Sequence, residues 1–162
     1  MNPLLAAVLE AQTFCRAQGW RFCFIGGLAV QRWGEPRLTQ DADLTVITGF
    51  GTEAPFVETL LARFPGRLAD AHAFALRNRV VLIRSSGGVP LDISLGAIPF
   101  EEHAVLRASD FTMAPGVVIS TCSAEDLIVF KAFAGRAKDW LPHRVQSSST
   151  GSAPRRLVST TE

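Results

Sequence analysis

Apolar residues recur along the chain with two different periods, and these periods separate helices from strands. Between residues 3 and 18 they return every three or four positions, which is the spacing of one helix face. Five shorter segments are rich in β-branched or aromatic residues, as strands are. The predicted strands are 20–25, 41–47, 80–84, 91–95 and 116–120. The other predicted helices are 28–33, 54–63, 100–107 and 124–134.

This mixture predicts an α/β (α+β) fold with a small, mixed, twisted sheet and helices packed mainly on one face. Ser-Ser-Gly-Gly between residues 84 and 89 predicts a hairpin-like connection. With 162 residues, 48% of them hydrophobic, the chain can form one domain with a real core, which we place at residues 1–140. Residues 141–162 are rich in Ser, Thr and Pro and are predicted to be a disordered or altered tail.

Composition narrows the range of partners. A net charge of +1 gives no indication of non-specific nucleic-acid binding.

Three cysteines without metal-ligand spacing are typical of reduced, buried thiols in a cytoplasmic protein. The first residues lack the basic region of a signal peptide, and no apolar run approaches the ~18 residues of a membrane span.

Three aspartates carry most of the candidate chemistry. Asp41 and Asp43 are two residues apart on a predicted strand, so their side chains point to one face together with Thr39. Asp92 stands alone between two apolar residues of a later strand. If the two strands are neighbours, three carboxylates converge, and such a group is costly without a cation. Carboxylate oxygens are ligands that Mg²⁺ prefers. Taken singly, the same residues are also typical of a solvated strand face or a strand edge.

A glycine pair precedes these aspartates. Gly26 and Gly27 follow a predicted strand and open a short helix, where backbone N–H groups can approach phosphate closely. The pair by itself is also compatible with a simple tight turn. Arg32 and Arg37 flank the turn, and Arg37 is placed either to contact substrate or to neutralise Asp41.

Lys131 lies on the apolar stripe of the predicted helix 124–134. Its amine either reaches water while its stem packs, or points at phosphates or at the carboxylates. The charged residues that follow are also typical of a helix end. These are Arg136, Lys138 and Asp139.

The order of these motifs resembles the nucleotidyltransferase superfamily, which has a DNA polymerase β-like fold. Its pattern is a strand, Gly-Gly or Gly-Ser, a short helix, Asp-x-Asp and a third acidic residue on a later strand. The motifs are most similar to those of AbiEii-type toxins of type IV toxin–antitoxin systems. In this chain they are Gly26-Gly27-Leu28-Ala29, Arg37-Leu38-Thr39-Gln40-Asp41-Ala42-Asp43, Leu91-Asp92-Ile93, and Lys131 with Arg136-Ala137-Lys138-Asp139, all within residues 20–140.

The resemblance implies roles for individual residues. Asp41 and Asp43 would bind metal, with two Mg²⁺ ions expected, and Asp92 would be the third ligand or a base. Gly26 and Gly27 would hold the triphosphate. The remaining residues implied at the site are Lys131 in catalysis, and Arg37, Thr39, Arg136, Lys138 and Asp139 in nucleotide binding.

Proteins of this superfamily transfer a nucleoside monophosphate from an NTP to an acceptor hydroxyl and release pyrophosphate. By resemblance, the acceptor is tRNA, a protein or a small molecule, and a cognate antitoxin is an expected partner. Family members continue with further helices where Pro142 and the Ser/Thr-rich tail stand here. An alternative hypothesis is therefore a truncated, catalytically inactive fold that binds an NTP or a protein partner.

Overall fold

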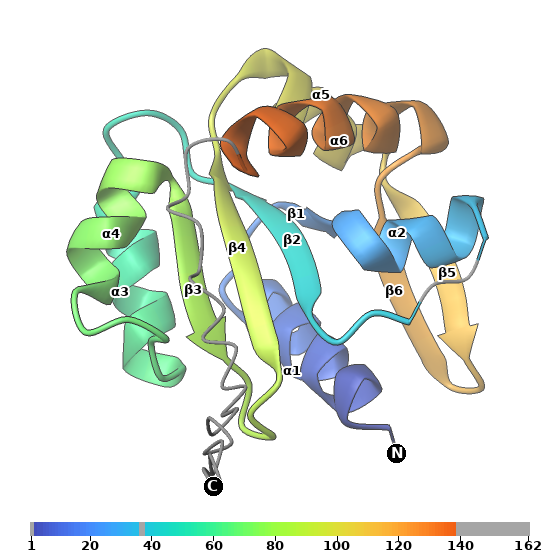
Figure 1. Cartoon of the computed structure of the whole chain (residues 1–162), viewed down its shortest axis with the longest axis horizontal. Helices are drawn as coiled ribbons and strands as arrows, with labels where there is room; N and C mark the ends of the chain where they lie inside the picture. The colour runs from blue at the N-terminus through green and yellow to red at the C-terminus, as the bar shows by residue number, and fades with distance from the viewer. Residues whose placement is uncertain (1, 36–37, 139–162) are drawn as a thin grey trace, which may run out of the picture.

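The computed structural model describes residues 2–35 and 38–138, with the side chains of 134–138 left out of the description. Helices and strands are interspersed along this part of the chain (Figure 1). The helices are α1 (Pro3–Ala17), α2 (Gly26–Trp33), α3 (Ala54–Arg63), α4 (Ala71–Asn78), α5 (Pro99–Arg107) and α6 (Ala124–Lys138). The strands are β1 (Phe22–Phe24), β2 (Ala42–Ile47), β3 (Val80–Arg84), β4 (Pro90–Gly96), β5 (Ser109–Ala114) and β6 (Val117–Thr121).

The strands form one mixed sheet in the order β3-β4-β2-β1-β6-β5. The β2–β4 and β1–β6 pairs are parallel, and the other pairs are antiparallel. This arrangement confirms the predicted mixed sheet and α/β class. It also confirms that the strands carrying Asp43 and Asp92 are neighbours, because β2 is hydrogen-bonded to β4 along its whole length.

Alternation along the central strands decides which side chains form the core. Leu44 on β2 and Leu91 and Ile93 on β4 are buried against residues of α1, α3 and α4. Phe14 of α1 meets Phe64, the residue that follows α3, with ring centroids 5.2 Å apart. Figure 1 shows α1 behind the sheet and α6 on the viewer's side. A second, smaller cluster joins β1, α2 and α6.

Two elements were not predicted. Helix α4 is short and buries only Ala75 fully, so its apolar pattern is weak. Strand β5 is an exposed edge strand that pairs only with β6 through the turn at Gly116. Neither has the sustained periodicity on which a prediction depends. The predicted tail, 141–162, lies outside the described residues. Among the described helices, none is long and apolar enough to cross a membrane.

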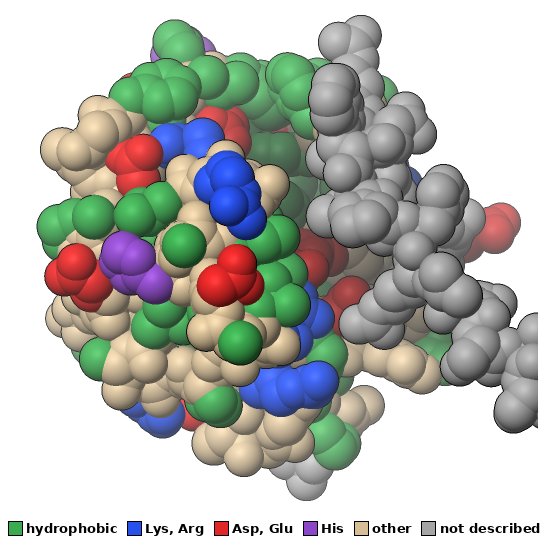
Figure 2. Space-filling model, turned by 60° about the vertical axis from the view of Figure 1, so that its left-hand side comes forward, with side chains coloured by type: hydrophobic (Ala, Val, Ile, Leu, Met, Phe, Trp, Pro, Cys, Tyr) green, Lys and Arg blue, Asp and Glu red, His purple; other side chains and the backbone are tan. Residues whose placement is uncertain are grey.

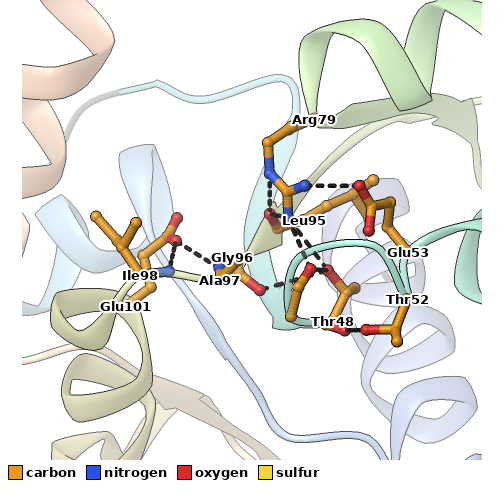
Figure 3. Close-up of polar contacts among 10 residues, drawn as sticks. Thr48, Thr52, Glu53, Arg79, Leu95, Gly96, Ala97, Ile98 and Glu101 are labelled. Atoms are coloured by element: carbon orange, nitrogen blue, oxygen red, sulfur yellow. Dashed lines mark hydrogen bonds and ion pairs between the residues drawn. The ribbon is translucent and has the colours of Figure 1, made fainter.

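One arginine joins the ends of the two central strands (Figure 3). Arg79 follows α4 with a left-handed backbone, φ 55°. Its guanidinium donates hydrogen bonds to the carbonyls of Leu95 (2.6 Å) and Gly49 (3.1 Å) and to Glu53 Oε1 (2.9 Å). Because Leu95 belongs to β4 and Gly49 follows β2, Arg79 fixes the ends of the parallel pair relative to each other.

Replacing Arg79 should therefore loosen the sheet. We expect Arg79→Ala to lower the free energy of unfolding by about 2 kcal/mol, because buried strand-end carbonyls lose their charged donor. Arg77→Ala is the matched control, since Arg77 is exposed on α4 and pairs with Asp70 only at 3.9 Å. Urea unfolding of both variants measures the difference. Equal stability of the two variants would contradict this role of Arg79.

Candidate functional site

Two carboxylates face each other across the β2–β4 pair. Asp43 and Asp92 are register partners in this parallel ladder, and neighbouring strands lie about 4.8 Å apart. Both side chains project from the face opposite the Leu44, Leu91 and Ile93 core, as alternation predicts. Both are partly buried. The sheet thus places two acidic groups side by side where neither is fully hydrated.

The glycine pair packs directly against these groups. Ile25 N–H donates to the Asp43 carbonyl at 2.9 Å, so the chain enters α2 beside Asp43. A Cβ on Gly26, whose φ is +58°, would stand 2.2 Å from Asp43 Oδ2, and one on Gly27 would stand 2.6 Å from Thr39 Oγ1. The Gly27 N–H also donates to the Asp43 carboxylate. The pair therefore makes room for the Asp43 and Thr39 side chains and supplies a donor to one of them.

Asp41 completes the acidic group from the residue that precedes β2. It is exposed, and Thr39 Oγ1 donates to its Oδ1 at 3.0 Å. Its charge acts on both Asp43 and Asp92. Within the described residues, however, no three His, Cys, Asp or Glu side chains are close enough to enclose a metal ion by themselves.

The electrostatics of the pair follow from burial and like charge. Burial, followed by the charges of Asp41 and Asp92, raises the pKa of Asp43 to about 6. The Gly27 N–H and the Arg67 guanidinium lower this pKa and so oppose part of the shift. Burial also raises the pKa of Asp92, and Arg67 opposes this shift. The site therefore favours binding of a cation, because a positive charge would lower the free-energy cost of ionising Asp43 and Asp92.

Arg67 is the site residue that the sequence did not reveal. It precedes α4, and its backbone N–H donates to the Leu82 carbonyl at 2.9 Å. This hydrogen bond lies beside an isolated β-bridge between Gly66 and Ile83. From this edge position its guanidinium forms an ion pair with Asp92. No local pattern marks Arg67, because its placement depends on pairing with a strand some fifteen residues later in the chain.

The structure places Lys131 differently from the predicted apolar stripe. Leu127 of that stripe is buried, whereas Ile128 beside it is 70% exposed. The residues that face the protein are Asp126, Leu127 and the half-buried Phe130, whose ring packs 5.1 Å from Phe100. Lys131 is exposed, and no hydrogen bond or ion pair among the described residues joins it to the carboxylates. Its proposed catalytic role stays a prediction.

Several other predicted residues cannot be placed at the site. Arg37 and Asp139 lie outside the described residues, and only the backbone of Arg136 and Lys138 is described. Arg32 forms its hydrogen bonds with β5 and β6, since it donates to the Ser109 carbonyl at 2.8 Å and to Thr121 Oγ1 at 2.9 Å. The three cysteines are free and buried, as predicted, and burial raises the pKa of each thiol.

Comparison with known proteins bears on the fold. No protein-family model matches the chain, and no curated protein matches it. Among solved structures, it is similar to an antigenic nucleotidyltransferase-like protein from Paracoccidioides brasiliensis, with 18% identity and a TM-score of 0.48. That match covers 82% of this chain and 66% of the fungal protein, so the chain spans just under two thirds of that relative.

A second solved structure carries the fold assignment. It is a candidate nucleotidyltransferase from Thermotoga maritima, 12% identical, with a TM-score of 0.54 over 84% of this chain and 87% of that one. At this level of identity the likeness concerns architecture only. The chain has a nucleotidyltransferase-like fold, in agreement with the fold implied by the sequence motifs.

The close contact at Gly26 gives a first test of the site. Gly26→Ala should cost at least about 2 kcal/mol of stability beyond the strain of a left-handed alanine, because its methyl group must displace the Asp43 carboxylate. Gly19→Ala is the matched control, with φ +69° and nothing within 4 Å of the added Cβ; its cost should be about 1 kcal/mol. Chemical denaturation compares the two variants, and equal costs would contradict the packing of Gly26 on Asp43.

The charge on Asp43 should destabilise the metal-free protein. The Asp43 pKa is about 6 in the folded protein and near 3.8 when unfolded, so the cost is absent below pH 4 and complete above pH 6. Asp43→Asn should therefore raise stability by about 1–2 kcal/mol at pH 8 without metal, and the gain should shrink as pH falls through 6.

Asp70→Asn is the control for this measurement, because Asp70 is exposed on the neighbouring segment. Thermal unfolding in a chelator at pH 4.5 and pH 8 distinguishes the variants. A loss of stability in Asp43→Asn at pH 8, or a gain that does not depend on pH, would show that burial and the neighbouring charges do not destabilise the ionised carboxylate.

Proposed function

We propose that the chain is a Mg²⁺-dependent nucleotidyltransferase that moves a nucleoside monophosphate from an NTP to an acceptor hydroxyl. The observation that supports this most directly is the register pairing of Asp43 with Asp92 on parallel strands, with Gly26 packed against Asp43. The nucleotidyltransferase-like fold and the order of the sequence motifs support it further.

The donor chemistry at the site fits magnesium. Asp43, Asp92 and Asp41 offer carboxylate oxygens, and Mg²⁺ commonly takes one or two protein carboxylates and completes its shell with water and substrate phosphates. An open group of this kind is consistent with the lack of a closed three-residue cage in the described part of the chain. When bound, the metal would supply charge neutralisation for the triphosphate and the attacking oxygen.

In the proposed reaction the acceptor oxygen bonds to the α-phosphorus while the bond from that phosphorus to the β-phosphate bridging oxygen breaks. Pyrophosphate leaves with the bond electrons, and the acceptor proton passes to a base. Asp92 is our candidate for that base or for the third metal ligand, because burial already raises its affinity for a proton. The first turn of α2, which begins at Gly26, provides N–H groups and a favourable dipole for the phosphates.

A narrower form of the proposal concerns biological role. The resemblance to AbiEii-type toxins supports the toxin of a type IV toxin–antitoxin system, with tRNA, a protein or a small molecule as acceptor. Figure 2 shows acidic, basic and hydrophobic side chains intermixed on the face that it presents. The net charge of +1 favours a protein or small-molecule acceptor over a long nucleic acid.

A second candidate function is nucleotide or protein binding without turnover. It is favoured by two observations in the described part of the chain: Asp41 is turned toward Thr39, and Asp92 is paired with Arg67. A site that holds its carboxylates in this way could bind a nucleotide and lack the geometry for transfer.

A labelling experiment separates these functions. The protein is incubated with Mg²⁺ and each of the four α-³²P-labelled NTPs, with total tRNA, lysate protein or small-molecule acceptors, beside an Asp41→Ala/Asp43→Ala control. We expect label on one acceptor class and none with the control, with a loss of at least about 100-fold. Carboxylate-dependent NTP binding without transfer would support the binding function instead. Neither binding nor transfer would overturn both.

A further inference from the structure

Arg67 stands at the end of a row of residues that crosses the sheet. Asp43 pairs with Asp92, Asp92 pairs with Leu82, and the Leu82 carbonyl accepts the Arg67 N–H. The row spans β2, β4, β3 and the edge segment before α4. Gly66 lets this edge segment pack against the start of α4, because a Cβ there would stand 2.7 Å from the Ala71 Cβ. The backbone thus directs the Arg67 side chain across Leu82 to the acidic face.

The Arg67 guanidinium is only partly satisfied by its surroundings. Its side chain is 21% exposed, and its Nη2 pairs with Asp92 Oδ1. Its Nε is buried and has no hydrogen-bond partner. Arginine presents several donors in a planar fork that suits carboxylate or phosphate oxygens. One buried donor of Arg67 therefore lacks a partner at the border of the acidic group.

Asp92 cannot serve Arg67 and a metal ion equally well. Its carboxylate is 33% exposed, so it has limited space for partners. A divalent cation that approaches Asp43 and Asp92 meets the positive charge of Arg67 on one of its ligands. Metal binding alone is therefore opposed by Arg67, whereas a triphosphate that arrives with the metal offers Arg67 new oxygens.

We infer that Arg67 is an exchangeable counter-ion, which holds Asp92 before substrate arrives and moves to the nucleotide phosphates when the metal–nucleotide complex binds. This inference rests on the proposed nucleotidyltransferase site. It makes Arg67 a residue that couples the binding of metal to the binding of triphosphate, so that the site takes up the complex in preference to the free ion. Because the phosphates are common to all NTPs, this coupling does not depend on the base.

The test uses two probes that need no knowledge of the base or the acceptor. Isothermal titration measures the affinity for Mn²⁺ alone and for Mg²⁺–tripolyphosphate, in the full chain and its variants. Arg67→Gln should bind Mn²⁺ about 5- to 50-fold more tightly and Mg²⁺–tripolyphosphate about 5- to 50-fold more weakly. Changes of opposite sign would not follow from a merely structural defect.

Three further variants complete the design. Arg67→Lys keeps the positive charge and should retain most of the discrimination against free Mn²⁺. Arg67→Gln placed in an Asp92→Asn background should no longer raise Mn²⁺ affinity. Arg77→Gln is the matched control, because Arg77 is exposed on α4, and it should change neither affinity. Thermal unfolding confirms that each variant is folded.

The outcomes separate this inference from the proposed function. If the wild-type chain binds both probes and loses both with Asp43→Ala, while Arg67→Gln leaves the affinities unchanged or moves them in the same direction, the exchange role of Arg67 is overturned and the proposed site stands. If the wild-type chain binds neither probe in a carboxylate-dependent way, the proposed function fails and the exchange role fails with it.

Discussion

The partial burial of two neighbouring carboxylates, Asp43 and Asp92, is the constraint around which this end of the sheet is organised. Parallel pairing of β2 with β4 brings the two side chains to the same level, and burial keeps water from screening them fully. Such an arrangement persists only when the rest of the structure enforces it. The enforcing contacts are the apolar core behind the strands and the Arg79 bonds that join the strand ends. Strain at the acidic face and stability of the core are thus properties of the same two strands.

The compensating contacts around the carboxylates come from different parts of the chain. Gly27 donates a backbone N–H to Asp43 from the start of α2, and Arg67 pairs with Asp92 from the edge segment beside β3. Neither contact neutralises both carboxylates. The residual negative charge is what a divalent cation would relieve, so the same imbalance that costs stability provides affinity for a ligand.

Sequence patterns predicted the local elements well and the long-range contacts only in part. The alternation of Leu91, Asp92 and Ile93 determines which side of β4 is acidic, because side chains alternate on any strand. The pairing of β2 with β4 does not follow from the sequence, since strand order is not encoded locally. Arg67 escaped prediction for the same reason: its position depends on the bridge between Gly66 and Ile83. Helical spacing puts Lys131 on one stripe with Leu127, yet Leu127 packs in the smaller core cluster and Lys131 is exposed, because tertiary packing and not the helical period selects the buried residues.

The glycine pair shows how two motifs that look independent in sequence form one structural unit. A glycine-rich turn before a helix is usually explained by phosphate approach, and that explanation leaves its link to the later Asp-x-Asp motif unstated. Here each glycine is required by a particular side chain, Gly26 by Asp43 and Gly27 by Thr39, so a methyl group at either position would collide with the acidic segment. The turn and the aspartates therefore constrain each other sterically whether or not a nucleotide is bound. A chain that kept the aspartates and lost the glycines would have to displace Asp43 from Gly26 and Thr39 from Gly27, and the site would lose the geometry on which its proposed chemistry depends.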